Sequence, residues 1–230
     1  MDIDLHLDDP THRMIAAPTR AGKSYFVGAC IEQMYEQEHP FIILDTKTDN
    51  HIGLQELPKV KKIQIKTGLN YDWGKLIDYP YVLCVPTLRT RTADLVALYR
   101  ELADEMFMSQ GERHLIVEEA HNWNKNASVA DPTLELIARE GAGRKKFLWF
   151  VTQRLQNFPQ ILWSQCGYTY LFRHKIPSDI RYISQGIPDF ETLNKSLFPH
   201  DVLVWDQGAV EEDTTIIKAA DVTRRTHHRG

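Results

Sequence analysis

The fold is decided by residues 16–24, which read AAPTRAGKS. This stretch follows a short apolar run and precedes a segment with helical periodicity, so we expect a strand, a tight loop and a helix in succession. A loop in that position can point its backbone N–H groups at phosphate oxygens, and the helix N-terminus adds partial positive charge. Gly22, Lys23 and Ser24 fill the last three positions of the pattern G-x-x-x-x-G-K-[ST]. The stretch therefore predicts a phosphate-binding loop.

The residues of this loop have distinct expected roles. Lys23 is expected to reach the outer phosphates, and the hydroxyl of Ser24 is expected to bind Mg²⁺. The residues expected to contact the nucleotide are Ala17, Pro18, Thr19, Arg20, Ala21, Gly22, Lys23 and Ser24. Ala17 stands where the pattern has its first glycine, and alanine adopts positive φ only at a cost. Either the loop begins here in an ordinary conformation or it fits a nucleotide less well; a simple helix start is the alternative for an isolated motif.

Length and composition indicate one globular domain. The chain has 230 residues, of which 43% are hydrophobic and 25% are charged, with a formal net charge of −4. We expect a single domain over residues 1–222 and a basic flexible tail over residues 223–230. Because the overall charge is slightly negative, a nucleic-acid partner would have to be bound by a local basic patch.

The cysteines and the apolar runs bear on the cellular compartment. Cys30, Cys84 and Cys166 are far apart in the sequence and lie in apolar patterns, which predicts buried, reduced thiols instead of disulfides or a zinc cluster. No run approaches the ~18 apolar residues of a membrane-spanning helix. We therefore expect a protein of the cell interior, or of a particle assembled there, that does not insert stably into a membrane.

Strand and helix patterns alternate along the rest of the chain. Expected strands cover residues 41–44, 62–66, 81–86, 115–117, 147–151 and 168–172, and expected helices follow the loop and then begin near residues 92, 131, 160, 178 and 189. In the first helix, Glu32, Gln33 and Glu36 are expected to face water. The alternation predicts an α/β fold, with a mostly parallel sheet covered by helices on both faces. A closing hairpin of residues 202–205 and 214–218 adds antiparallel strands.

Two adjacent carboxylates end one of the buried strands. Glu118 and Glu119 follow the apolar residues 115–117 directly, and the carboxyl ends of parallel strands face the nucleotide in folds of this class. Because successive side chains of a strand point in opposite directions, one carboxylate can approach the metal while the other addresses the attacking water. We assign Glu118 to Mg²⁺ and Glu119 to the water. Two solvated glutamates at a strand end are the alternative.

The end of the following strand supplies further candidates. Gln153 is positioned to sense the terminal phosphate or the same water, although an exposed amide is nearly as consistent with the sequence. Phosphoryl transfer also needs positive charge on the phosphates, which a neighbouring subunit can supply. Arg139, Arg144 and Arg154 are candidates for that role. We expect one of the three to serve, with Arg144 as the first choice.

The motif series resembles that of the FtsK–HerA superfamily of DNA-pumping ATPases. The resemblance rests on residues 17–24, 115–121, 143–146 and 151–154, and it extends over roughly residues 13–175. It implies a RecA-like P-loop NTPase core of the ASCE type, ATP with Mg²⁺ as cofactors, and a homo-oligomeric ring of six subunits with double-stranded DNA at its centre. The family usually has aspartate where this chain has Glu118, whose side chain is one methylene longer.

The compact size is similar to that of genome-packaging ATPases of tectivirus-like viruses, which are tailless and have an internal membrane. This resemblance implies packaging of a viral genome into a preformed capsid, capsid-vertex or portal proteins as partners, and a location in the host cytoplasm and at the packaging vertex of the virion. Among the basic segments that could hold DNA, we favour residues 123–130, which include Lys125. The alternatives are an assembly ATPase of the filamentous-phage type, a small-molecule kinase, and a nucleotide-binding vertex scaffold without turnover.

Overall fold

The computed structural model describes residues 3–209 and 214–227 of the chain. The strands are β1 (His12–Ala16), β2 (Phe41–Leu44), β3 (Val60–Ile65), β4 (Tyr81–Pro86), β5 (Arg113–Val117), β6 (Lys146–Thr152), β7 (Cys166–Phe172), β8 (Val202–Asp206) and β9 (Thr214–Ile217). The α-helices are α1 (Lys23–Glu36), α2 (Trp73–Ile77), α3 (Thr92–Met108), α4 (Pro132–Glu140), α5 (Gln160–Trp163), α6 (Pro177–Ile183) and α7 (Phe190–Ser196). Short 3₁₀ turns include η1 (Ile52–Glu56), η2 (Ala120–Asn122) and η3 (Ala142–Arg144).

All the strands join one sheet in the order β3-β4-β2-β5-β6-β1-β7-β8-β9. The pairs from β3 to β7 are parallel, whereas β7 with β8 and β8 with β9 are antiparallel. The expected parallel sheet with antiparallel C-terminal strands is therefore confirmed. β1 lies between β6 and β7, so the loop that follows β1 is flanked by the carboxyl ends of two other strands.

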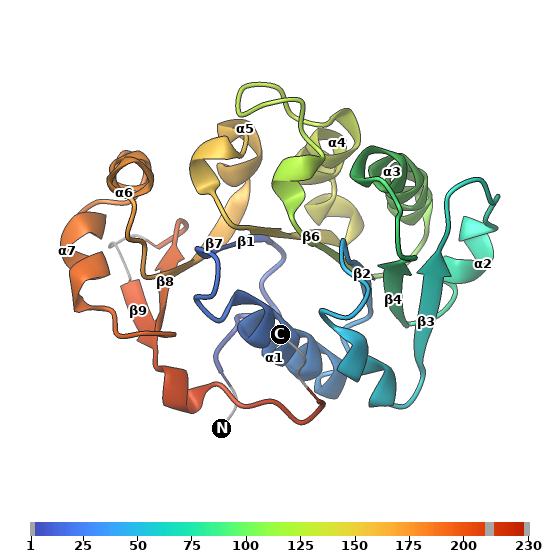
Figure 1. The fold of residues 1–230 in the computed structure, drawn as a ribbon, viewed down its shortest axis with the longest axis horizontal. Coiled ribbons are helices and arrows are strands. Elements are labelled where there is room, and N and C mark those ends of the chain that lie inside the picture. Colours follow the sequence, from blue (N-terminus) through green and yellow to red (C-terminus); the bar gives the residue numbers. More distant parts are fainter. Residues whose placement is uncertain (1–2, 210–213, 228–230) are drawn as a thin grey trace.

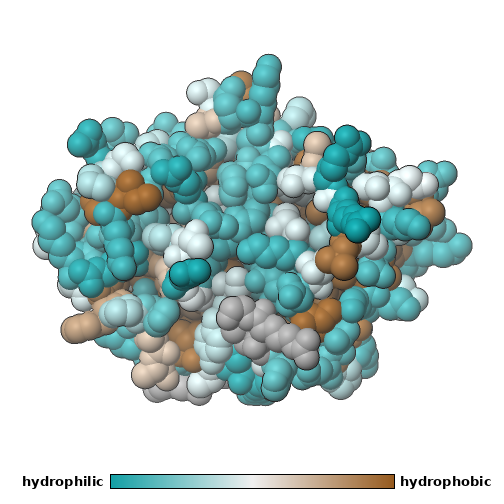
Figure 2. Space-filling view, viewed as in Figure 1, coloured by the Kyte–Doolittle hydropathy of each residue, from teal (hydrophilic) through white to brown (hydrophobic). Residues whose placement is uncertain are grey.

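Helices cover both faces of the sheet. Figure 1 shows α1 on one face and α3, α4 and α5 on the other. Each face has its own apolar core, and β2, β4 and β6 are buried along their whole lengths because they pack against both cores. The surface seen in Figure 2 is mostly hydrophilic, with small separate hydrophobic patches. Within the described residues, no helix combines the length and the apolar character needed to cross a bilayer.

The exposed face expected for α1 is wrong at two positions. Glu32 is 4% exposed and Gln33 is 8% exposed, although both are polar. The reason is a segment that we call the C-terminal strap, residues 219–227, which runs past the lower end of α1 in Figure 1. Within the strap, Arg224 Nε donates to Glu32 Oε1 at 2.7 Å, and Thr226 Oγ1 donates to the same oxygen at 2.6 Å. These hydrogen bonds from the strap compensate for burial of the Glu32 carboxylate.

The expected flexible tail is also wrong over residues 223–227, which belong to this strap; residues 228–230 lie outside the described part of the chain. Both side chains of the Arg224–Glu32 ion pair are at most 5% exposed. Farther along, the backbone of His227 approaches Gly53 so closely that a Cβ at Gly53 would lie 1.9 Å from the His227 carbonyl oxygen. The strap therefore joins α1 to the region of η1.

Candidate nucleotide-binding site

The phosphate-binding loop connects the end of β1 to the start of α1. Ala17 N–H donates to the carbonyl of Thr152 at 3.1 Å, which ties the start of the loop to β6. Ala17 is not among the residues with positive φ, whereas Arg20 and Gly22 are, at 65° and 96°. The loop therefore begins in a conformation that alanine adopts without strain, and the first glycine of the pattern is not needed for the backbone geometry.

Replacing Ala17 by glycine tests this interpretation. We expect nucleotide affinity to change by less than about twofold, because the backbone already has an ordinary conformation. The unfolding free energy should fall by about 0.4–1 kcal/mol, because glycine adds conformational freedom to the unfolded chain. Fluorescent-nucleotide titration and thermal unfolding measure the two quantities. A large gain in affinity would contradict our interpretation of Ala17.

Gly22 is the position in the loop where glycine is required. Its φ of 96° is unfavourable for other residues, and a Cβ there would lie 2.8 Å from His200 Nδ1. His200 Nδ1 is also 2.9 Å from the carbonyl oxygen of Ala21. His200 could not be predicted as a neighbour of the loop, because it lies almost 180 residues after it in the chain. It borders the loop on the side of β7 and β8.

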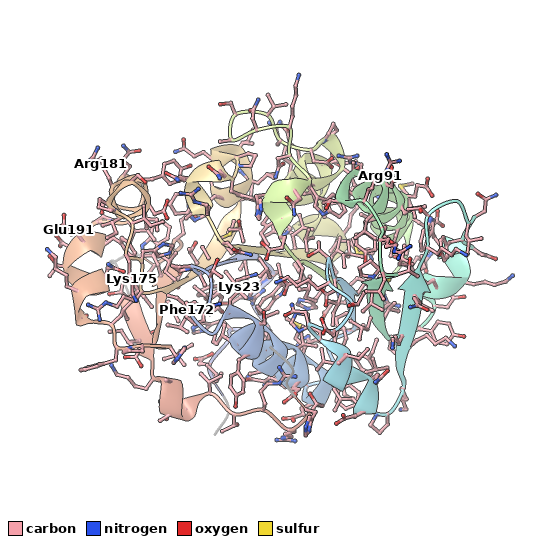
Figure 3. The ribbon with its side chains drawn as sticks, viewed as in Figure 1. Lys23, Arg91, Phe172, Lys175, Arg181 and Glu191 are labelled. Carbon is pink, nitrogen blue, oxygen red and sulfur yellow. The ribbon has the colours of Figure 1, made fainter. Side chains whose placement is uncertain are left out.

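Lys23 lies between the two predicted carboxylates. Its Nζ is 3.2 Å from Glu118 Oε2 and 3.5 Å from Glu119 Oε1. Figure 3 shows Lys23 near the middle of the view, where α1 begins. Burial would by itself lower the pKa of Lys23, but the negative charges of Glu118 and Glu119 outweigh that effect and raise it. The ammonium group is therefore charged at neutral pH.

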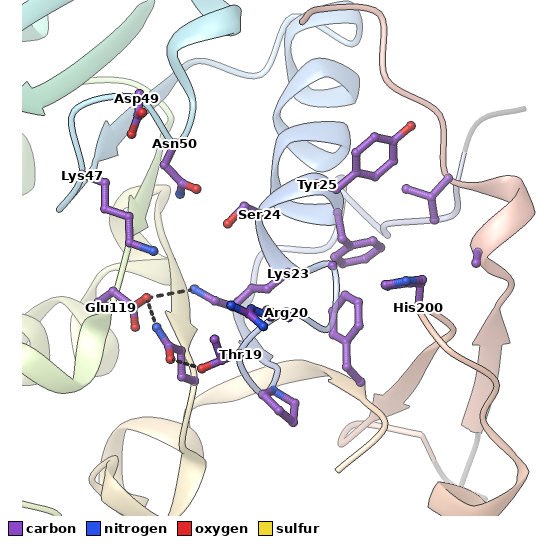
Figure 4. Close-up of a pocket in the computed structure, with 17 residues that line it drawn as sticks. Thr19, Arg20, Lys23, Ser24, Tyr25, Lys47, Asp49, Asn50, Glu119 and His200 are labelled. Atoms are coloured by element: carbon purple, nitrogen blue, oxygen red, sulfur yellow. Dashed lines mark hydrogen bonds and ion pairs between the residues drawn. The ribbon is translucent and has the colours of Figure 1, made fainter. Parts of the chain in front are cut away.

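The expected alternation of the two carboxylates does not hold. Glu119 has a φ of 49° and a ψ of 47°, so the chain turns into the left-handed region directly after β5. As a result both carboxylates reach Lys23, and the strand rule no longer separates them. Gln153 Nε2 donates to Glu119 Oε1 at 2.5 Å, and Thr19 Oγ1 donates to Gln153 Oε1 at 2.8 Å (Figure 4). The loop, β5 and β6 are thereby linked through side chains.

The loop after β2 contributes residues that sequence reasoning missed. His51 Nε2 is 2.7 Å from Glu118 Oε1, and both side chains are almost completely buried. Asp45, at the end of β2, has no exposed surface, and burial raises its pKa to about 6, although the nearby His51 opposes the shift. Lys23 and the bond from His51 outweigh burial at Glu118 and hold the pKa of that carboxyl well below its usual range.

The phosphate-binding loop, Lys23 and Glu119 line a cavity of about 1000 Å³. Figure 4 shows its polar end at Lys47, Lys23 and Glu119, with Tyr25 and His200 on the other side of α1. The remaining lining residues are Pro18, Thr19, Arg20, Gly22, Ser24, Phe26, Asp49, Asn50, Gln153, Phe172, Ala219 and Val222. The volume is that of a small-molecule site, and the positive loop lies at the end where phosphates would be placed.

The residues present fit a divalent cation. Mg²⁺ prefers oxygen ligands, and Ser24 lines the cavity beside the carboxylates. Asp45 Oδ2 is buried, yet within residues 3–209 and 214–227 it has no hydrogen-bond partner. Buried carboxylate oxygens without donors are costly, and a cation would remove that cost.

The three candidate arginines lie in different places. Arg144 is in η3, just before β6, whereas Gln153 follows the other end of that seven-residue strand. At about 3.3 Å per residue, the two ends are roughly 20 Å apart, so Arg144 does not serve the pocket of its own chain. Arg139 pairs with Glu135 on α4, at 2.6 Å. Arg154 is exposed at the end of β6 that faces the pocket. A role for any of them across a subunit boundary stays a prediction.

A second cluster of possible metal ligands is explained by hydrogen bonds. Glu112 Oε1 lies 2.7 Å from His39 Nδ1 and 3.2 Å from His114 Nε2, at the edge of the sheet opposite the loop. Trp149 Nε1–H donates to His114 Nδ1 at 3.1 Å. A neutral imidazole has one N–H, so His114 keeps its proton on Nε2, where a metal would have to bind. The cluster is therefore a hydrogen-bonded group.

No family model matches the sequence, and no curated protein matches it. Among solved structures, the genome packaging NTPase B204 from Sulfolobus turreted icosahedral virus 2, in complex with ATP-gammaS, is similar with a TM-score of 0.70 at 18% identity, covering 91% of this chain and 98% of that one. The plasmid coupling protein TrwB, in complex with a GTP analogue, is similar with a TM-score of 0.66 at 8% identity, and the match covers 96% of this chain and 88% of TrwB. The pCW3 conjugation coupling protein TcpA is similar with a TM-score of 0.56 at 15% identity, and the match covers 91% of this chain and 60% of TcpA.

At such identities these likenesses establish the fold, and the expected fold is confirmed. The chain has the RecA-like fold of the P-loop NTPases.

Proposed function

We propose that this protein is an ATP-hydrolysing motor that moves double-stranded DNA, and that its task is to package a viral genome into a preformed capsid. The observation that carries the proposal is the contact of Lys23 with both carboxylates beside a cavity of about 1000 Å³. The loop offers the phosphate cradle, and the carboxylates offer the groups that hydrolysis needs. The likeness to a packaging NTPase and to coupling proteins supports the choice of DNA as the load.

In this mechanism each residue of the site has a separate role. Lys23 leaves the carboxylates and pairs with the outer phosphates. Glu119, held by Gln153, accepts a proton from the attacking water through Oε2, which has no hydrogen-bond partner among the described residues. Ser24 and Glu118 would hold Mg²⁺, which neutralises charge that develops on the phosphates. Because Gln153 also bonds to Thr19, a phosphate in the loop is linked to the position of the base.

The proposal includes an assembly. A homo-oligomeric ring, which we propose to be hexameric, would place the ATP sites at subunit boundaries with DNA in the centre and an arginine supplied by the neighbouring subunit. Residues 123–130 form a loop that stands out from the layer of α3, α4 and α5 (Figure 1), with Lys125 exposed and Trp123 buried at its base. That loop is our candidate for the DNA contact. Capsid-vertex or portal proteins would be the partners, in the host cytoplasm and at the packaging vertex.

The test is ATP hydrolysis by the purified protein, measured with and without linear duplex DNA. A motor is expected to hydrolyse ATP faster with duplex, and the increase should grow with duplex length at a constant concentration of ends. Replacing Lys125 by glutamate should reduce the stimulation and leave the DNA-free rate unchanged. Nucleotide binding without turnover under every DNA condition would contradict the motor and favour a nucleotide-binding scaffold.

A further inference from the structure

His51 occupies a buried position beside the proposed metal-binding carboxylate. It follows β2, which pairs with β5 so that Leu44 is opposite Val117, and this pairing brings the segments after the two strands together. The His51 side chain has no exposed surface, and its Nε2 lies 2.7 Å from Glu118 Oε1. His51 Nδ1 has no hydrogen-bond partner among the described residues. The ring is therefore held through Nε2.

The two oxygens of Glu118 have different partners. Oε2 is 3.2 Å from Lys23 Nζ, and Oε1 is bonded to His51. Binding of a nucleotide would draw Lys23 toward the phosphates. A buried carboxylate that loses its cation is strongly destabilised unless other donors remain. The bond from His51 does not depend on Lys23, so it can persist when the lysine leaves.

The hydrogen bond from His51 is more important because the Glu118 side chain is long. A glutamate has one more rotatable bond than an aspartate, and a carboxylate that positions a cation must keep a single orientation. Glu118 has this longer side chain. Free rotation of the longer side chain would let its carboxylate oxygens occupy several positions. The bond from His51 to Oε1 restricts that rotation and thereby also fixes Oε2.

We propose that His51 is a positioning residue that holds Glu118 in place while Lys23 moves from the carboxylates to the nucleotide phosphates. The proposal rests on the proposed nucleotide site and adds a residue from a loop outside all the recognised motifs. His51 does not touch the nucleotide. It acts through Glu118, so its loss should affect Mg²⁺-dependent steps more than nucleotide binding itself.

The experiment compares His51→Ala with His51→Gln. Loss of a residue that orients a metal ligand typically costs about 10–100-fold in metal affinity or activity. For His51→Ala we expect a loss of kcat in that range, nucleotide affinity without Mg²⁺ within about twofold of the parent protein, and a weakened gain in affinity when Mg²⁺ is added. Glutamine keeps an N–H at similar reach and should restore most of both properties.

Glu118→Asp supplies a coupling test. The shorter carboxylate should not reach His51, so His51→Ala should add little to the effect of Glu118→Asp, whereas the two changes would simply add if they acted independently. His114→Ala is the matched control, because His114 is also fully buried and lies at the opposite end of β5. It should lower stability without altering the Mg²⁺ dependence of nucleotide binding.

The outcomes separate this inference from the proposed function. Normal kcat and normal Mg²⁺ dependence in His51→Ala would overturn the role of His51 and leave the motor intact. A glutamine variant as impaired as the alanine variant would overturn it as well. If the parent protein binds nucleotide without turnover, the motor fails, and the role of His51 is decided by the Mg²⁺ dependence of nucleotide binding in the same variants.

Discussion

Glu119→Gln is expected to slow ATP hydrolysis by about 10²–10⁴-fold, the usual contribution of a positioned general base. Glutamine has nearly the same shape but cannot accept a proton from water. The contact with Lys23 would lose its charge, yet Lys23 keeps Glu118 as a partner at 3.2 Å. Nucleotide binding should therefore be nearly unchanged. Steady-state hydrolysis and fluorescent-nucleotide titration measure the two properties.

Gln153→Glu is the matched comparison for this experiment. It replaces the donor to Glu119 Oε1 by a second carboxylate, while the bond that Thr19 Oγ1 donates can remain. We expect a smaller loss of rate than with Glu119→Gln, because Gln153 orients the base and takes no proton. Turnover by Glu119→Gln close to that of the parent protein would contradict the assignment of Glu119 as the base.

Glu32→Ala is expected to lower the free energy of unfolding by about 3–5 kcal/mol, the range measured when one partner of a buried ion pair is removed. The change leaves the Arg224 guanidinium buried without its carboxylate, and it also removes the acceptor of Thr226. Urea unfolding measures the effect. The prediction depends on the C-terminal strap and is independent of any nucleotide.

Glu36→Ala is the control, one turn farther along α1. Glu36 pairs with Arg225, but the two side chains are 28% and 68% exposed. Such a pair is worth about 0–1 kcal/mol. A double change of Glu32 and Arg224 should cost less than the sum of the two single changes, because it leaves no unpaired buried charge. Equal small effects of Glu32→Ala and Glu36→Ala would mean that the strap does not bury Glu32 in solution.

Local chemistry was enough to predict most of the elements and the main parts of the site. Asp131 followed by Pro132 predicted the start of α4, and Asp131 Oδ1 accepts from the backbone N–H groups of Thr133 and Leu134. The loop and the carboxylates were found because each follows a buried strand, and parallel strands bring their carboxyl ends to one edge of the sheet. The helix α2, which has five residues, was not predicted.

What could not be predicted depends on contacts between distant segments. Glu32 has the place of a surface residue in the helical pattern, and its partner Arg224 lies 192 positions later. His51 lies in a polar loop without a motif, and its contact with Glu118 requires that β2 and β5 be neighbours. The sequence shows that Arg144 lies just before a strand, but it does not show which end of the sheet that strand start occupies. The direction of β6 in the structure places Arg144 far from the loop.

The central place of β1 has a consequence for synthesis on the ribosome. β3, β4, β2 and β5 can pair with one another once the chain up to Val117 has emerged. β1 is made first, yet its neighbours β6 and β7 are complete only at residues 152 and 172. Pairings over such long separations form slowly. The nascent chain therefore contains the complete loop sequence before the strands that flank β1 exist. A nucleotide bound at the proposed site would stabilise only chains in which β6 and β7 have already been made.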